Sequence, residues 1–166
     1  MARTRVIVCA AMGLALAVLA QSLRFFLPLP SGPLSQLVIG GLVNLALVLT
    51  VRFSGSPWTA NVGFFLPLVA FLQGQLPLLP IVPVVGIGNT VFAALAGAIL
   101  WKSRFVWLAP FVKAALLYGG TQLVLCAIDL PEPALSALSM AMGAPQIVTG
   151  LVGVALAKIV ARRAGR

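Results

Sequence analysis

The stretch "LSQLVIGGLVNLALVLTVRF", residues 34–53, decides the fold class of this chain. Its only charged side chain is that of Arg52, next to its last residue. The hydrocarbon core of a bilayer is about 30 Å thick, and a helix needs about 20 predominantly apolar residues to cross it. The stretch therefore predicts a transmembrane helix.

Five further stretches have the same apolar character and are separated by breaks rich in proline, glycine, serine and charged residues. They are, approximately, 6–26, 58–76, 81–101, 106–128 and 135–160. No break is long enough to hold a soluble domain; the breaks are 28–33, 54–57, 76–83, 102–104 and 129–133. We expect an all-α membrane protein, a six-transmembrane-helix bundle in which residues 1–166 form a single integral membrane domain.

The composition supports this class and excludes several functions. Hydrophobic residues make up 61% of the chain and charged residues 8%, against about 25% charged in soluble domains. The mean hydropathy is +1.15. The net charge is +9, but the basic residues are dispersed and form no basic face interleaved with aromatics, so we expect no nucleic-acid binding.

The chain offers little to catalysis or metal binding. It has no histidine, and Asp129 and Glu132 are its only acids. Metal sites of histidine, cysteine and carboxylate ligands, acid–base pairs and serine triads are therefore not expected. The remaining reactive groups, on Lys113, Tyr118 and Cys126, form no evident catalytic constellation. We expect neither an enzyme nor a metal protein.

The basic residues set the orientation, because cytoplasmic loops of membrane proteins carry an excess of lysine and arginine. With both termini in the cytoplasm, Arg24 and the two acids fall on the outer side. Nine of the 11 basic residues then fall on the cytoplasmic side: Arg3, Arg5, Arg52, Lys102, Arg104, Lys158, Arg162, Arg163 and Arg166.

One alternative to this topology stays open. The first residues, "MARTRVIVCAAMGLALAVLAQS" (1–22), combine a basic start, an apolar run and small residues at Val18 and Ala20, as a secretory signal peptide does. Cleavage there would leave five spans. The apolar character continues to Leu27, and the charge pattern agrees with six spans, which favours a first helix that is retained.

Polar side chains inside the predicted spans are candidates for a binding site, because they are costly in hydrocarbon unless they face protein or a wet cavity. Several recur at four-residue spacing with small residues, which places them on one helical face, and Pro145 is expected to kink the last helix. The candidate substrate-binding residues are Gln36, Asn44, Gln73, Asn89, Tyr118, Gln122 and Gln146, with Arg24 and Lys113 as weaker candidates.

Most of these residues lie from the middle of the membrane outward. An apolar bundle with a few convergent amides and a tyrosine is typical of a site for a neutral or weakly charged small molecule. The alternative is that the amides only bond the helices to one another beside glycine and alanine contacts. The sequence leaves both interpretations open.

The first span carries two rows of small residues. Ala11 and Ala15 are four residues apart in its cytoplasmic half, and Cys9, Gly13 and Ala17 form a second row. Small residues at this spacing permit close approach of another helix.

The chain resembles the substrate-binding S component of energy-coupling-factor (ECF) transporters, which import vitamins. Its length, six expected spans and near-absence of soluble parts are similar, and several stretches look like an uncharacterised branch of the family. These are "LPLPSGPLSQLVIGGLVNLALVL" (27–49), "FFLPLVAFLQGQLPLLPIVPVVGIGNTVF" (64–92) and "FVKAALLY" (111–118). In the family, an alanine-xxx-alanine motif of the first helix docks onto the coupling subunit, and Ala11 and Ala15 match it.

The resemblance implies a prokaryotic cell-membrane protein that captures a small organic nutrient near the outer face. The loops joining helices one to two, three to four and five to six would cap the substrate. A transmembrane coupling subunit and two ATPases would be separate chains that use ATP, so no cofactor is expected in this one. Nickel or cobalt transport is disfavoured, because the histidine-rich motif of metal-specific members is absent. The alternative function is a small structural or assembly protein without a ligand.

Lys113 is the one charge within an otherwise uncharged stretch, "FVKAALLYGGTQLVL" (111–125). Pro110 favours the first turn of a helix, so Lys113 is expected about one turn in. Helical side chains lean toward the N-terminus, here the cytoplasm. We expect Lys113 to reach back to water, to contact the coupling subunit or to pair with another helix, with direct substrate contact less favoured. Tyr118 and Gln122, farther along, are the stronger ligand candidates.

Overall fold

The computed structural model describes residues 2–26 and 33–165, and within these residues it contains helices and no strand. The all-α class predicted from the sequence is confirmed. In chain order the helices are α1 (Ala2–Phe26), α2 (Pro33–Ser54), η1 (Pro57–Asn61), α3 (Val62–Leu72), α4 (Ile81–Ala94), η2 (Leu95–Ile99), η3 (Arg104–Leu108), α5 (Ala109–Leu125), α6 (Glu132–Ala141) and α7 (Ala144–Arg163). Helices η1 and η3 are 3₁₀-helices, and η2 is a π-helix.

In the described part of the chain, five helical stretches are long and apolar enough to cross a membrane, by length and composition. The third predicted span, 58–76, is shorter than expected, because its helix runs only over Pro57–Leu72. Pro57 fits the first position of this helix. Beyond Leu72 the backbone turns away at Gly74, whose φ of 70° is the left-handed conformation that commonly ends helices.

The last predicted span, 135–160, lies within a helical stretch, Glu132–Arg163, that is long enough to cross a membrane but is interrupted. The structure divides it into α6, which ends at Ala141, and α7, which begins at Ala144. Pro145 has no backbone N–H and fits only the first turn of a helix, so a regular helix restarts there. The interruption, at Met142 and Gly143, lies just before the proline at which a kink was expected. The predicted break at 28–33 lies, except for Pro33, outside the described residues.

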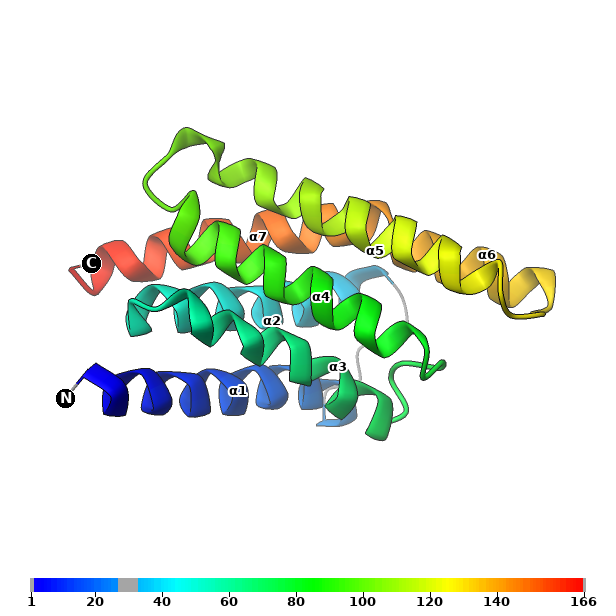
Figure 1. Ribbon diagram of the computed structural model, residues 1–166, viewed down its shortest axis with the longest axis horizontal. Helices are drawn as coiled ribbons and strands as arrows, with labels where there is room; N and C mark the ends of the chain where they lie inside the picture. The colour runs from blue at the N-terminus through cyan, green and yellow to red at the C-terminus, as the bar shows by residue number, and fades with distance from the viewer. Residues whose placement is uncertain (1, 27–32, 166) are drawn as a thin grey trace.

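Consecutive spans run in opposite directions (Figure 1), and their contacts close into a ring. Around the ring the order is α1, α2, α7, α5, α4 and α3, and α3 packs on α1 again. Helix α2 also packs on α4 and η2, so it is the most buried of the long helices. Glycines permit these close contacts; a Cβ on Gly97 would lie 2.6 Å from Cβ of Val51.

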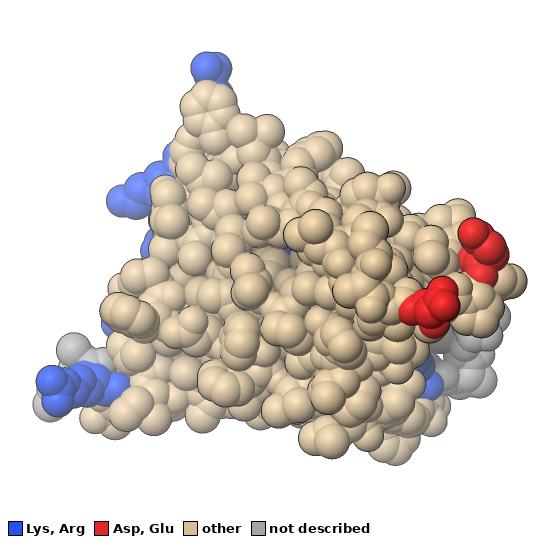
Figure 2. Space-filling model, turned by 45° about the vertical axis from the view of Figure 1, so that its right-hand side comes forward, with Lys and Arg blue, Asp and Glu red and all other residues tan. Residues whose placement is uncertain are grey.

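Charge is divided between the two ends of the bundle. The start of α1 and the end of α7 lie at one end (Figure 1), and basic residues gather there (Figure 2). We call it the basic end. The Arg5 guanidinium donates to the backbone O of Phe53, 2.7 Å away, which ties α1 to α2. Asp129 and Glu132 lie at the opposite end, here called the acidic end (Figure 2).

Candidate functional site

A cavity of about 170 Å³ lies inside the ring, between α1, α2, α3, α4, α5 and α7. We call it the central cavity. Its apolar walls come from residues such as Ile39, Val43, Leu66, Leu76 and Val85. Its polar lining consists of Gln21, Arg24, Gln36, Asn44, Gln75, Asn89, Lys113 and Gln146.

The cavity occupies the half of the bundle toward the acidic end. Its lining comes from the C-terminal halves of α1 and α3 and from the N-terminal halves of α2, α4 and α7. Because consecutive helices are antiparallel, these halves meet at one end (Figure 1). Lys113, from the first turns of α5, is the exception and marks the inner limit of the cavity. Arg24 is exposed and lies toward the acidic end.

Lys113 does not reach the basic end, so the expectation that its side chain returns to water is wrong. Its side chain is only 3% exposed. The ammonium Nζ donates to Oδ1 of Asn44 at 2.7 Å and lies 5.1 Å from the ring centre of Phe92. Of the roles considered for this lysine, pairing with another helix is the one observed. The physical reason is that Asn44 offers an acceptor inside the ring.

Asn44 connects this lysine to α7. It is 1% exposed, and its amide Nδ2 donates to Oγ1 of Thr149 at 3.3 Å. The Thr149 hydroxyl in turn donates to the backbone O of Gln146 at 3.2 Å. The close contact between the helices depends on Gly153, where a Cβ would lie 2.5 Å from Cβ of Asn44. A polar chain therefore runs across the cavity floor from α5 through α2 to α7.

Asn89 differs from the other buried amides because it has no partner. Its side chain is 5% exposed and lines the central cavity. It forms no hydrogen bond with any group in the described part of the chain. The fully buried side-chain atoms without a partner do not include those of its amide, so the amide faces the open space of the cavity. Asn89 is therefore a polar group to which a molecule in the cavity would bond favourably.

The structure brings together most of the residues singled out in the sequence. Gln36, Asn44, Asn89 and Gln146 line the central cavity, and so do the two weaker candidates, Arg24 and Lys113. These residues come from α1, α2, α4, α5 and α7 and are far apart in sequence. Gln36 and Gln146 both also donate to the backbone O of Ala141, at the end of α6.

Three candidates lie outside the cavity lining. Gln73 accepts from Gln21 at 2.8 Å and donates to Ser22 at 3.0 Å, which bonds the end of α3 to α1. Gln122 donates to Ser139 on α6 at 2.9 Å, and Tyr118 is 48% exposed. Successive residues turn by about 100° on a helix, so the α5 face that turns Lys113 inward turns Tyr118 and Gln122 away.

Sequence reasoning missed two of the lining amides. Gln75 lies in the connection between α3 and α4, where no helical period indicates which way a side chain faces. Gln21 follows Gly13 and Ala17 at four-residue spacing, and all three residues are buried. A Cβ on Gly13 would lie 1.8 Å from Oγ1 of Thr50 on α2, so this row faces the ring. Continuing the row to Gln21 would have found it.

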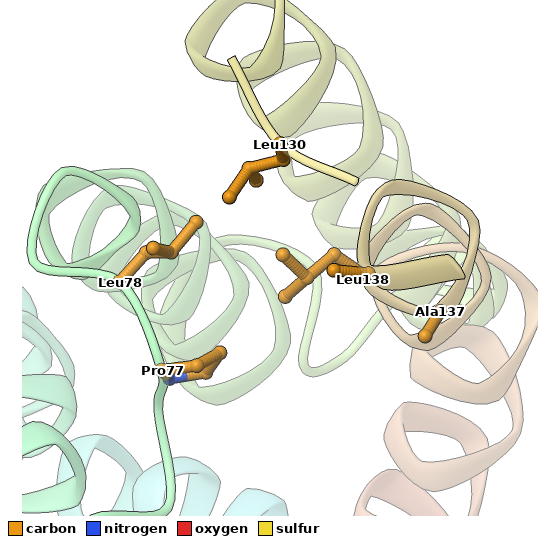
Figure 3. Close-up of a pocket in the computed structure, with 6 residues that line it drawn as sticks. Pro77, Leu78, Leu130, Ala137 and Leu138 are labelled. Atoms are coloured by element: carbon orange, nitrogen blue, oxygen red, sulfur yellow. The ribbon is translucent and has the colours of Figure 1, made fainter. Parts of the chain in front are cut away.

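A larger hollow of about 340 Å³ lies between the α3–α4 connection, the α5–α6 connection and α6. Figure 3 shows Leu78, Leu130 and Leu138 pointing toward one another across it. Its lining is wholly apolar and includes no group that would orient a ligand. A binding site normally combines apolar walls with a few placed polar groups, so the smaller central cavity is the better candidate.

Comparison of the chain with protein-family models, with curated proteins and with solved structures finds no match. No group of three or more potential metal-ligating side chains occurs within residues 2–26 and 33–165.

Proposed function

We propose that the chain is the substrate-binding S component of an ECF-type transporter and captures a small organic nutrient, a vitamin or related compound. The observation that carries the proposal is the central cavity itself. Polar side chains from five helices converge on one apolar-walled cavity, and one of them, Asn89, forms no hydrogen bond with any other described residue. Amides that served only to bond helices together would all be paired.

The distribution of charge supports an orientation for this function. Because basic residues favour the cytoplasmic side, the basic end would lie inside a prokaryotic cell with both termini. The central cavity then faces outward, where a nutrient arrives. The sixth crossing would be made by the shorter helix over Pro57–Leu72. The connections at the acidic end would cap the bound molecule.

The surface of α1 supports docking onto a coupling subunit. Ala11 and Ala15 are exposed and Gly13 and Ala17 are buried, so one row of small residues is available to a partner and the other packs within the ring. The partner would be a transmembrane coupling subunit that carries two ATPases. Uptake would follow when the whole S component tilts against that subunit, with ATP used by the partner chains.

Docking is tested by the double variant Ala11→Leu with Ala15→Leu. We expect it to lose the coupling subunit and ATPases when the tagged chain is isolated from its native membrane, because leucines prevent close helix approach. The bound small molecule should remain, because neither alanine lines the cavity. Mass spectrometry of the isolated complex measures both.

The matched control is Ala115→Leu with Gly119→Leu, which alters two exposed small residues four apart on α5. A Cβ on Gly119 meets no atom within 4 Å, so this variant should keep both partners and ligand. If the Ala11/Ala15 variant retains the partner chains in the same amount as wild-type protein, these two alanines do not form the docking surface.

The position of the site is tested by substituting two glutamines, Gln146 and Gln122, both of which the sequence predicts to bind substrate. Gln146→Leu should reduce the amount of bound small molecule about tenfold, the effect of losing one or two hydrogen bonds in a desolvated site. Gln122→Leu should leave it unchanged, because Gln122 bonds to Ser139 outside the cavity. A loss of bound compound from Gln122→Leu but not from Gln146→Leu would indicate that the site lies at the α5–α6 face instead. The measurement is the amount of compound released per mole of each purified variant.

A structural or assembly protein is the second candidate. The bonds among Gln21, Gln73 and Gln75 favour it, because they join α1 to the end of α3 without any ligand. Isolation of the native protein separates the two functions. A small molecule bound in stoichiometric amount supports the S component, and its absence together with the absence of ATPases supports the assembly role.

A further inference from the structure

The basic side chains of the central cavity have no acidic side chain beside them. Lys113 and Arg24 line it, and no aspartate or glutamate does. Asp129 and Glu132 are the only acids of the chain, and both are exposed at or beyond the end of α5. A protein interior tolerates a buried ammonium poorly unless an anion pairs with it. An anion bound in the cavity would therefore stabilise the protonated form of Lys113, and no acidic side chain of the lining does so.

The surroundings of Lys113 leave room for that anion. An ammonium has three N–H donors. Among the described residues Lys113 makes one hydrogen bond, to Asn44, and one contact with the Phe92 ring. Asn89, one helical turn before Phe92 on α4, presents its unpaired amide to the same cavity. Helices α4 and α5 are close here, since a Cβ on Gly88 would lie 3.9 Å from the backbone O of Lys113.

We propose that the central cavity binds a small organic monocarboxylate, whose carboxylate pairs with the Lys113 ammonium and bonds to the Asn89 amide. Of the two basic residues that line the cavity only Lys113 is buried, and one buried cation balances one negative charge, which favours a carboxylate over a phosphate dianion. The apolar walls, which include Ile39, Leu66 and Val85, would hold the rest of the molecule. A cavity of about 170 Å³ is below the range of about 300–1,000 Å³ typical of drug-sized ligands, so the acid is small. This inference rests on the proposed function, because it names the substrate class of the same site.

The test compares compounds carried by tagged protein purified from cells grown in rich medium. Released compounds are identified by mass spectrometry before and after esterification in acidic methanol, which adds one methyl group per carboxylic acid. We expect wild-type protein to carry a compound that gains one methyl group. The Lys113→Met variant should carry at most about one tenth as much of this compound, because a hydrogen bond to a charged group is lost.

A second variant covers the case in which Lys113→Met fails to fold. Asn44→Asp is nearly isosteric and places a carboxylate 2.7 Å from the ammonium, so it should fold and exclude the ligand by occupying its counter-ion position. Ala115→Leu, on an exposed position of the same helix, should retain the compound. Retention of the partner ATPases by each variant reports folding independently of the ligand.

Each outcome supports or overturns the inference. Loss of a monocarboxylate from Lys113→Met or Asn44→Asp, with retention by Ala115→Leu, supports it. A wild-type compound without an acid group overturns the inference and leaves the proposed function standing. A fatty acid or detergent carried equally by all variants also overturns it. If wild-type protein carries no compound and no partner chains, the proposed function itself fails.

Discussion

Replacing Gly153 with leucine is expected to prevent α7 from packing on α2 and to abolish recovery of folded protein. A Cβ at this position would lie 2.5 Å from Cβ of Asn44 and 3.0 Å from the backbone atoms C of Asn44 and N of Leu45. Backbone atoms cannot rotate aside as a side chain can, so the two helices must separate. Overpacking of a well-packed interior costs about 1–3 kcal/mol, and more where backbone must move.

The measurement is thermal unfolding and size-exclusion chromatography of the detergent-solubilised protein. Gly119→Leu is the matched control, because a Cβ there meets no atom within 4 Å and glycine is a poor helix former. The control should be at least as stable as wild type. Equal stability of the Gly153→Leu and Gly119→Leu proteins would show that α2 and α7 are not in close contact at Asn44.

The second large effect concerns the bond between Lys113 and Asn44. Asn44→Leu should lower the free energy of unfolding by about 3 kcal/mol, because it leaves a buried ammonium without its acceptor. Adding Lys113→Met to this variant should restore most of the lost stability, since replacing both partners by apolar groups of similar shape is nearly neutral. The double variant should therefore be more stable than Asn44→Leu alone.

Denaturant unfolding of ligand-free protein in mixed micelles measures this double-mutant cycle. The coupling energy between the two substitutions should be in the range of about 0.5–3 kcal/mol found for residues in contact. Additive effects of the two substitutions would contradict the pairing and return Lys113 to the role of a lysine that reaches water. The cycle needs no knowledge of the substrate, so it is independent of the proposed function.

Several residues of the candidate site were predictable from the sequence. Gln36, Asn44, Asn89 and Gln146 are polar groups in runs too apolar to leave them facing lipid, and each sits in a row of small residues. Hydrophobicity and helical period together place such groups inward. The same reasoning predicted that Tyr118 and Gln122 face the site, but neither lines the cavity. Helix α5 has polar residues on several faces, and the helical period alone does not indicate which of these faces is turned inward.

Lys113 shows most clearly where sequence reasoning stops. Its place near the start of α5 and the lean of helical side chains both favoured a return to water. Asn44, which is 69 positions away in the sequence, supplies the acceptor that holds it inside. The two rows of small residues on α1 are a similar case. Only the packing of Gly13 against Thr50 tells which row faces the ring and which remains exposed.

The sequence by itself determined the helical membrane class, most of the helix boundaries and the separation of charge along the chain. These properties follow from local physics: the length of apolar runs, the backbone limits of proline and glycine, and the cost of charge in hydrocarbon. Tertiary structure alone decided which polar faces meet, that Lys113 is buried and that one cavity joins six helices. Those outcomes depend on contacts between distant segments, such as Gly153 on Asn44, which no local pattern specifies.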